Sequence, residues 1–235
     1  MDDDLESTPR AVVLGTGSIG TRHRGLLEGL GLEVGSVSRR AGVSEFRSVD
    51  EAVRSLQPGY VVVATETERH RESVEQLVDA GFVGRVLLEK PVMDRLGPFP
   101  RAGFRSIAVG YQLRFHPAVR FFRAAVVGQR VLSAQARYGQ YLPDWRPTRD
   151  YRQTVTAGPA GGVLLELSHE LDYILWFFGD MENVDAVLHK NTKLGLDVEE
   201  RISVLSESVK SFNSGTLINI PPNRQAIVTN LQTNE

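Results

Sequence analysis

Short apolar runs alternate with amphipathic stretches along the first half of the chain. The runs are rich in β-branched residues, which predicts buried strands of a parallel sheet, and the stretches between them carry apolar residues at helical spacing. The predicted strands cover residues 10–14, 32–38, 60–64 and 85–88. The predicted helices cover residues 19–30, 50–56 and 69–80, the first with Ile19, Leu26, Leu27 and Leu30 on its apolar face and a stop at Gly31. This alternation is typical of a doubly wound α/β domain, with helices on both faces of the sheet.

From residue 130 onwards the pattern changes to longer strands joined by turns, which predicts a mostly antiparallel, open sheet. The predicted strands cover residues 131–145, 184–190, 200–208, 210–220 and 224–232. Between the first two of these, residues 161–179 predict one buried helix that carries a few polar residues. We therefore expect two domains: an α/β domain over residues 1–115 and an α+β domain over residues 116–235. The boundary lies near residues 110–117.

Composition and charge narrow the class of protein. The 235 residues include 27 Lys and Arg against 29 Asp and Glu, a net charge of −2, and the basic residues are scattered. No nucleic-acid or polybasic membrane surface is therefore predicted, and a small-molecule ligand is favoured. There is no cysteine, the first residues are acidic, and no apolar run is long enough to span a membrane. We expect a soluble, cytoplasmic protein.

A glycine-rich turn connects the first predicted strand to the first predicted helix. It reads Gly15-Thr16-Gly17-Ser18-Ile19-Gly20. In this context Gly15 allows the tight turn, Gly17 lets the backbone approach a pyrophosphate, and Gly20 lets the helix pack closely on the strand. The helix N-terminus then offers N–H groups and a positive dipole end to the phosphates. A purely structural turn is the alternative, because the motif by itself is weak.

The end of the second predicted strand reads Ser38-Arg39-Arg40. In a dinucleotide-binding domain this position contacts the adenosine ribose. A carboxylate there binds the 2′-hydroxyl of NAD, whereas an arginine accommodates the 2′-phosphate of NADP. The arginines favour NADP and leave NAD possible. Their alternative role is solvated surface charge.

Glu89-Lys90-Pro91 follows the fourth predicted strand, at the sheet edge where such folds bind their ligands. The chain uses arginine for 23 of its 27 basic residues, so a lysine at this place is unusual for its composition. The ammonium group of Lys90 suits a hydrogen bond to a substrate hydroxyl. A plain surface lysine is the alternative.

Polar residues interrupt the predicted helix over residues 161–179. Glu166, His169 and Asp172 are spaced three apart, which places them on one face of a continuous helix. Carboxylates on both sides of a histidine can set its tautomer and its pKa for acid–base work. A histidine satisfied within the core is the alternative. A His-Glu-x-x-His zinc helix is excluded because Tyr173 stands where the second histidine would be, so no metal is expected.

These sites, in this order, resemble the Gfo/Idh/MocA family of NAD(P)-dependent oxidoreductases. The resemblance runs from about residue 10 to residue 179 and includes residues 61–70 and 110–117. It implies a Rossmann domain whose glycine turn binds the dinucleotide. Family members oxidise a hydroxyl of a sugar or cyclitol or reduce the matching carbonyl. Residues 141–152 resemble those of members that act in acidic-sugar or surface-polysaccharide synthesis.

The resemblance also assigns roles to single residues. The implied catalytic residues are Lys90, His169 as the acid–base, and Glu166. The implied cofactor-binding residues are Gly15, Gly17, Ser18, Ile19, Gly20, Ser38, Arg39, Arg40, Thr65 and His70 on the nicotinamide side, and Glu89, Lys90 and Pro91. The implied substrate-binding residues are Tyr111, Arg114, Trp145, Arg146 and Asp172.

Three departures from the family leave a second hypothesis open. The family's helix carboxylate is an aspartate four residues before the histidine, whereas Glu166 is three before His169. Residues 93–105 are too few for the family's usual helix and connection, and the chain ends at Glu235, which predicts a smaller second sheet. The alternative to an enzyme is a non-catalytic dinucleotide-binding or sensor protein. In either case the open sheet predicts a homodimer or homotetramer.

Overall fold

The fold was analysed in a computed structural model. The structure describes residues 8–100, 103–129, 131, 134–136, 138, 141–145, 150–153, 161–190, 198, 201–208 and 216–219. The chain divides into two compact units, Met1–Gly110 and Tyr111–Glu235. The sequence places the boundary a few residues later, after residue 115.

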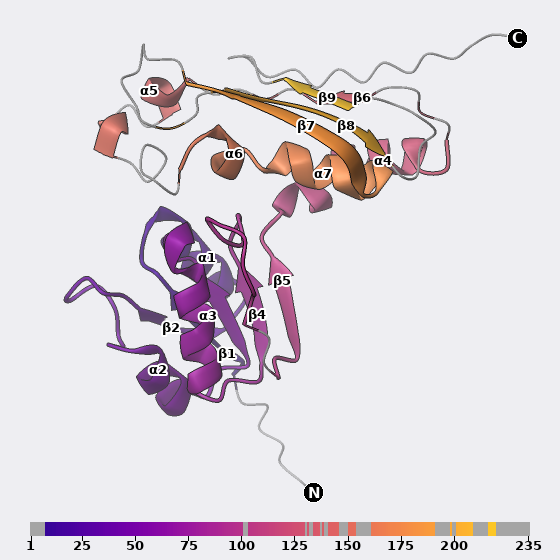
Figure 1. The fold of residues 1–235 in the computed structure, drawn as a ribbon. Helices are drawn as coiled ribbons and strands as arrows, with labels where there is room; N and C mark the ends of the chain where they lie inside the picture. Colours follow the sequence, from indigo (N-terminus) through magenta and orange to yellow (C-terminus); the bar gives the residue numbers. More distant parts are fainter. Residues whose placement is uncertain are drawn as a thin grey trace, which may run out of the picture. The chain divides into compact units, whose positions relative to one another are not determined.

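The first unit is a parallel sheet with helices on both faces (Figure 1), so the predicted doubly wound domain is confirmed. The strand order is β2-β1-β3-β4-β5. The strands are β1 (Arg10–Leu14), β2 (Glu33–Val37), β3 (Tyr60–Val63), β4 (Arg85–Leu88) and β5 (Ser106–Val109). The helices are α1 (Ser18–Gly29), α2 (Val49–Leu56) and α3 (His70–Asp79), with a 3-10 turn, η1 (Thr67–Arg69), before α3. The sequence pattern did not predict β5.

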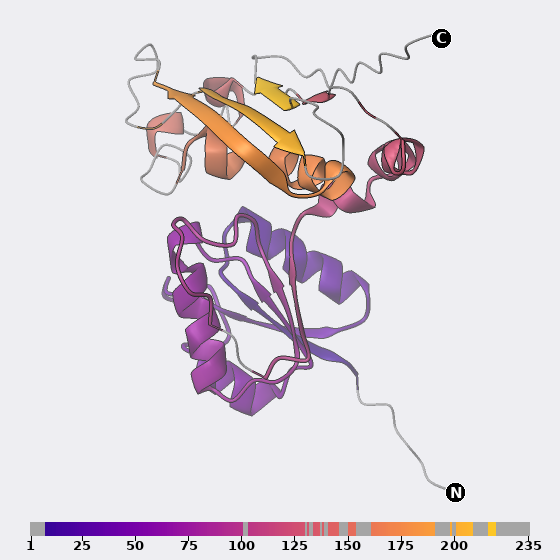
Figure 2. The same ribbon diagram turned by 45° about the vertical axis from the view of Figure 1, so that its right-hand side comes forward.

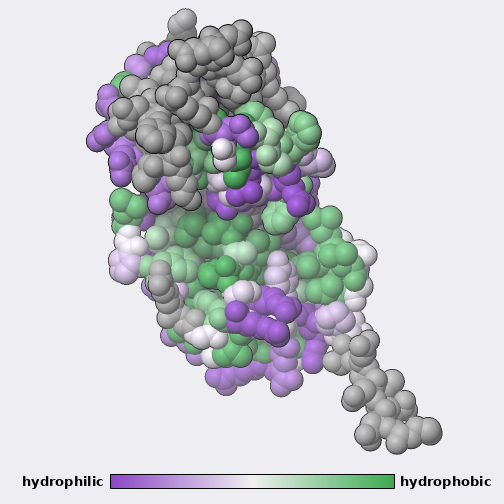
Figure 3. All heavy atoms as spheres, turned by 90° about the vertical axis from the view of Figure 1, so that its right-hand side faces the viewer, coloured by the Kyte–Doolittle hydropathy of each residue, from purple (hydrophilic) through white to green (hydrophobic). Residues whose placement is uncertain are grey.

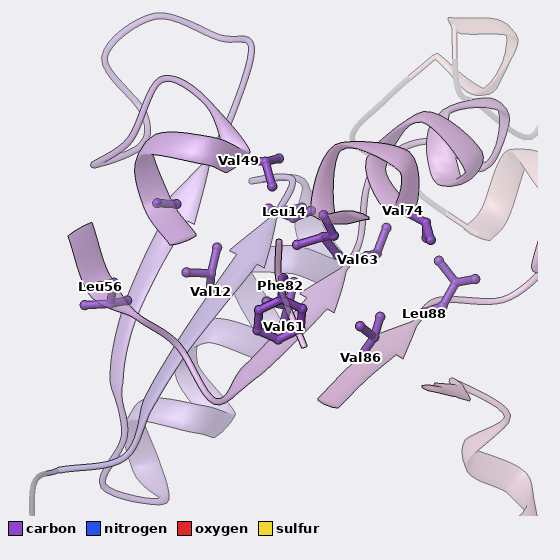
Figure 4. Close-up of a cluster of buried hydrophobic side chains, with 12 residues drawn as sticks. Val12, Leu14, Val49, Leu56, Val61, Val63, Val74, Phe82, Val86 and Leu88 are labelled. Carbon is purple, nitrogen blue, oxygen red and sulfur yellow. The ribbon is translucent and has the colours of Figure 1, made fainter. Parts of the chain in front are cut away.

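Alternate strand residues pack against different helices. Val12 and Val61 belong to the core cluster that includes side chains of α2 and α3, and Figure 4 shows this cluster in close-up. Val13 and Val62 belong to the cluster that includes Leu27 of α1. Figure 2 accordingly shows α1 and α3 on opposite sides of the sheet. Burial on both faces explains why these strands are apolar without alternation.

The predicted apolar face of α1 is only partly buried. Leu27 is 9% exposed, but Ile19, Leu26 and Leu30 are 43%, 56% and 76% exposed. The helix presents a narrow stripe to the sheet, because its buried residues are Gly20 and Leu27 alone. Helical spacing therefore predicted the element correctly and the width of its buried face incorrectly.

None of the described residues between β4 and β5 is helical, in agreement with the short connection expected from the sequence. Phe99 and Phe104 of this connection pack against the core cluster instead. The Phe104 ring lies 6.1 Å from the ring of Phe82. The connection thus contributes apolar side chains to the core without a helix.

The second unit contains a four-stranded sheet, in the order β6-β9-β8-β7, which confirms the predicted mostly antiparallel sheet. Only the pairing of β6 with β9 is parallel. The strands are β6 (Ala134–Ala136), β7 (Met181–His189), β8 (Arg201–Ser208) and β9 (Thr216–Asn219). The other elements are η2 (Gln112–Phe115), α4 (Pro117–Val126), α5 (Leu142–Trp145), η3 (Tyr151–Gln153), α6 (Val163–Glu166) and α7 (His169–Phe178). Ile174 and Phe178 of α7 pack in one cluster with Ile202 and Val204 of β8.

Two predicted elements of this unit are wrong. Residues 131–145 are not one continuous strand, because among the described residues of this range Ala134–Ala136 form a strand whereas Leu142–Trp145 form a helical turn. The single helix over residues 161–179 is two helices, α6 and α7, because the backbone leaves the helical conformation at Leu167 (φ −107°, ψ 34°). The predicted strand over residues 224–232 lies outside the described residues. The helix α4 was not predicted.

Apolar and polar residues are interspersed on the face of the molecule that Figure 3 shows. The long strand β7 is at the edge of its sheet and is exposed along most of its length. Val184, Val187 and Leu188 are 56%, 48% and 51% exposed. Within the described residues, no helix is both long and apolar enough to cross a membrane.

Candidate nucleotide-binding and catalytic sites

The register of the parallel sheet aligns the carboxyl ends of its strands. Leu14 pairs with Val37 on one side and with Val63 on the other, and Leu88 pairs with Val63 and Val109. The residues that follow these strands therefore lie along one edge of the sheet. They include the glycine turn, Ser38, Thr65, Glu89 and Gly110. In open α/β sheets this edge is where ligands bind.

The three glycines of the turn have three different environments. Gly15 has φ +100°, and a Cβ there would lie 2.5 Å from the carbonyl oxygen of Ala64. A Cβ on Gly20 would overlap the carbonyl oxygen of Gly15 and contact Val13. By contrast, no atom lies within 4 Å of a Cβ on Gly17, which is the N-cap of α1. Gly15 and Gly20 are therefore required by packing, while Gly17 leaves open space at a helix N-terminus, as an anion-binding turn needs.

Ser38, Thr16 and Arg40 form one hydrogen-bonded group beside this turn. The Thr16 hydroxyl donates to Ser38 Oγ at 2.9 Å. Arg40 Nη2 donates to the carbonyl oxygen of Thr16 at 2.6 Å and to its hydroxyl at 3.1 Å. Arg39 instead extends to Glu66, 3.5 Å away, with 67% of its side chain exposed. The structure thus brings Arg40, and not Arg39, to the glycine turn.

The nearest following carboxylate, Glu45, is engaged elsewhere. It accepts hydrogen bonds from the backbone N–H and the hydroxyl of Ser36 at 3.0 and 2.6 Å and from Arg24 at 2.6 Å. Partial burial raises the pKa of Glu45, but the bonds from Ser36 and Arg24 outweigh it and lower the pKa to about 2. Glu45 is therefore an ionised group that fastens its loop to β2.

Glu89, directly after β4, forms a close pair with a histidine that the sequence analysis missed. Nε2 of His23, on α1, lies 2.6 Å from Glu89 Oε1. The other oxygen of Glu89 accepts the backbone N–H of Lys90 at 3.2 Å. His23 could have been found from its place three residues after Gly20, because Gly20 faces the sheet and residues three apart share a helix face.

Thr65 and His70 lie at the end of β3 and the start of α3. The Thr65 hydroxyl contacts the Ser73 hydroxyl at 3.1 Å. His70 is 1% exposed, with Nδ1 2.9 Å from the carbonyl oxygen of Pro91 and Nε2 3.2 Å from that of Thr65. Burial lowers the pKa of His70, against the opposing effect of these carbonyls. Its ring therefore joins two segments inside the protein, and its expected place on the nicotinamide side of the cofactor stays a prediction.

In the second unit, His169 is the first residue of α7. The Tyr111 ring meets it edge-on at 5.6 Å, and the Tyr111 hydroxyl donates to Ser168 Oγ at 3.3 Å. Glu166 ends α6, so the prediction that Glu166, His169 and Asp172 share one face of a single helix is wrong. The break at residues 167 and 168 changes the helical phase between Glu166 and His169.

Arg114 and Asp172 bind each other. Two guanidinium nitrogens of Arg114 donate to the two oxygens of Asp172 at 2.8 and 2.6 Å. Side-chain exposure is 8% for Asp172 and 42% for Arg114. Asp172 is therefore paired with Arg114, and its expected influence on the tautomer of His169 stays a prediction. Of the other expected substrate contacts, Trp145 ends α5 and Arg146 lies outside the described residues.

Comparison with protein families gives a match within the first unit. Residues 10–99 match the family model described as "Oxidoreductase family, NAD-binding Rossmann fold", the Gfo/Idh/MocA family. No curated protein sequence matches the chain.

Among solved structures, the WlbA dehydrogenase from Bordetella pertussis, in complex with NADH and UDP-GlcNAcA, is 19% identical with a TM-score of 0.71 and covers 91% of this chain and 70% of its own. The scyllo-inositol dehydrogenase from Lactobacillus casei, with bound NAD(H) and scyllo-inositol, is 17% identical with a TM-score of 0.70 and covers 92% and 71%. An NAD-binding protein from Listeria innocua is 18% identical with a TM-score of 0.67 and covers 92% and 67%. At these identities the likeness is one of fold.

Proposed function

Residues 10–99 belong to the Gfo/Idh/MocA oxidoreductase family, with its NAD-binding Rossmann fold, and from this we propose that the chain is a dehydrogenase or reductase of a sugar or cyclitol. The observation that carries the proposal is the glycine turn. Its two outer glycines are required by packing, and the middle one opens the N-terminus of α1 to a ligand. A purely structural turn would not need the middle glycine, Gly17.

Lys90 and His169 are the proposed catalytic residues. Bound NAD(P) would accept a hydride from the carbon that carries the hydroxyl, or return it to the carbonyl. Lys90 would orient that oxygen by donating a hydrogen bond, and His169 would take up or return the hydroxyl proton. A positioned general base contributes about 10²–10⁴-fold in rate. Glu166 has a lesser role, since it lies on another helix than His169.

Several observations support the proposed substrate class. Similar structures hold a nucleotide-linked sugar acid and a cyclitol, namely UDP-GlcNAcA and scyllo-inositol. In the second unit, Tyr111, Arg114 and His169 lie on η2 and α7 or next to them, and Arg114, although paired with Asp172, keeps 42% of its side chain exposed. We propose a sugar with an acidic substituent as the first substrate to test. The chain has no cysteine, which supports a cytoplasmic location.

NADP is the proposed preferred cofactor. No carboxylate stands at the end of β2, because Ser38, Arg39 and Arg40 occupy it and Glu45 is bound to Ser36. A charge-assisted hydrogen bond to a 2′-phosphate contributes about 1.5–3 kcal/mol, or roughly 10- to 100-fold in affinity. NADPH should bind tighter than NADH by this factor, and Arg40→Ala should remove most of the difference. Arg39→Ala is the matched control with the smaller effect.

Fluorescence titration of both reduced cofactors against these variants tests the preference. Equal affinity for NADPH and NADH, unchanged by either substitution, would show that the arginines are only surface charge.

The reaction itself is tested by a spectrophotometric screen for reduced-cofactor formation. The panel contains UDP-GlcNAcA, free uronic acids, neutral sugars and inositols, each with NADP and NAD. Turnover with the members of one class identifies the substrate class. Cofactor binding without turnover on any class would favour the second candidate, a dinucleotide-binding sensor. The observation behind that candidate is the separation of Glu166 from the helix of His169.

A further inference from the structure

We propose that His23 is a positioning residue that sets the place of Lys90 through the carboxylate of Glu89. The inference rests on the proposed function, in which Lys90 is catalytic. It concerns only residues of the first unit, and it gives a role to a histidine on the cofactor-binding helix.

The contact between His23 and Glu89 is short and partly buried. Nε2 and Oε1 are 2.6 Å apart, and the two side chains are 20% and 19% exposed. Each residue comes from a different element, 66 positions apart in sequence. A hydrogen bond of this length between a ring N–H and a carboxylate is charge-assisted and directional. It therefore defines where the Glu89 side chain lies.

The carboxylate is confined on two further sides. Its second oxygen accepts the backbone N–H of Lys90 at 3.2 Å. Gly110, directly after β5, has no side chain, and a Cβ there would lie 3.2–3.3 Å from the Glu89 carboxylate. Glu89 thus packs between α1, the β5 end and its own strand end. His23 therefore orients the Glu89 carboxylate, and this carboxylate in turn accepts the backbone N–H of Lys90.

The charges around Glu89 keep this acceptor ionised. Burial raises the pKa of Glu89, but the hydrogen bond and electrostatic interaction with His23, together with the N–H and ammonium of Lys90, outweigh it, so the pKa is lowered overall. The titratable group His70 also interacts with Glu89. An ionised carboxylate binds the Lys90 N–H more strongly than a neutral carboxyl would.

This arrangement links two parts of the proposed site. The helix α1 begins at the glycine turn, and His23 lies one turn inside it. The segment after β4 carries Lys90. Replacing His23 should therefore disturb Lys90 and the chemical step while leaving the glycine turn able to bind the cofactor.

The test compares His23→Ala, the conservative His23→Gln, and Arg22→Ala as an exposed control on the same helix. Lys90→Ala is the reference for a lost catalytic group. For each variant we would measure kcat and KM with the substrate found by the screen, the NADPH dissociation constant, and the free energy of unfolding. His23→Ala should lower kcat about 10-fold, the scale of one charge-assisted hydrogen bond, with NADPH affinity changed less than 3-fold. His23→Gln, which can still donate to Glu89, should recover most of kcat.

A second measurement does not depend on turnover. Acetylation of Lys90 by a limiting amount of acetic anhydride, read by mass spectrometry against the exposed Lys190, reports how Lys90 is held. His23→Ala should speed the labelling of Lys90 relative to Lys190 by at least 3-fold, because Lys90 becomes more accessible, whereas Arg22→Ala should not.

The outcomes separate the two proposals. If Lys90→Ala leaves turnover unchanged, the proposed catalytic role of Lys90 fails. If Lys90→Ala abolishes turnover but His23→Ala behaves like Arg22→Ala in both kcat and labelling, the positioning role of His23 alone is overturned. If the screen finds no turnover, the labelling ratio decides: an unchanged ratio in His23→Ala overturns the positioning role.

Discussion

Alanine substitution at three glycines, the N-cap of α1 and two within the helix, should have three different results. A Cβ on Gly20 would overlap the carbonyl oxygen of Gly15, which is backbone and cannot rotate away. Overpacking of this kind costs about 3 kcal/mol, and the better helix propensity of alanine returns about 1 kcal/mol. Gly20→Ala should therefore lower the free energy of unfolding by about 2 kcal/mol.

Gly25 is the control for helix propensity, since it lies in the same helix and no atom is within 4 Å of its Cβ position. Gly25→Ala should stabilise the protein by about 0.5–1 kcal/mol. Gly17 also has open space, so Gly17→Ala should cost at most about 1 kcal/mol, the penalty for alanine at an N-cap. Its effect should instead appear in NADPH affinity, as a loss of at least about 10-fold, because the new methyl group would stand where the proposed site takes the pyrophosphate.

Urea denaturation and fluorescence titration of the three variants check these values. Wild-type stability in Gly20→Ala would show that α1 does not pack on the turn as described. Wild-type NADPH affinity in Gly17→Ala would show that the turn does not hold the pyrophosphate, and the proposed cofactor site would then be wrong.

Three further predictions concern catalysis, pH and assembly. His169→Ala and Lys90→Ala should each lower turnover by about 100-fold or more with cofactor affinity little changed, and Glu166→Gln should lower it less; steady-state kinetics measure this, and an equal loss in Glu166→Gln would place Glu166 among the catalytic groups. Glu45 has a folded-state pKa of about 2 against an ordinary value of 4.5, so its contribution to stability is full above pH 4.5 and is lost as the pH falls towards 2. Glu45→Gln should cost about 1 kcal/mol at pH 7, after allowance for solvent screening, and should flatten the urea stability profile between these pH values; a profile parallel to that of the wild type would contradict this. Light scattering should give at least twice the monomer mass of 26.0 kDa, because the exposed β7 residues need a cover; a monomer at micromolar concentration would overturn the proposed homo-oligomer.

The elements of the first unit could be predicted from the sequence because each of them is encoded locally. Strands buried on both faces are unbroken apolar runs, and Gly15 and Gly31 mark turns that need a positive φ. The roles of Gly15 and Gly20 followed from the same local logic. The strand β5 was not predicted because its four residues show no strong periodicity of apolar and polar positions.

Only the tertiary structure decided which side chains meet. Arg39 and Arg40 are adjacent in sequence, yet one extends to Glu66 and the other to the glycine turn. Asp172 is three residues from His169 but binds Arg114, 58 positions away. His23 and Glu89 meet because the sheet register brings the end of β4 next to α1. The break between α6 and α7 could not be predicted from the sequence for a related reason. A helix that is apolar on most faces has no clear amphipathic periodicity, so an interruption of the helix does not change the pattern. Local patterns determine elements, whereas long-range contacts depend on packing that no short stretch of sequence encodes.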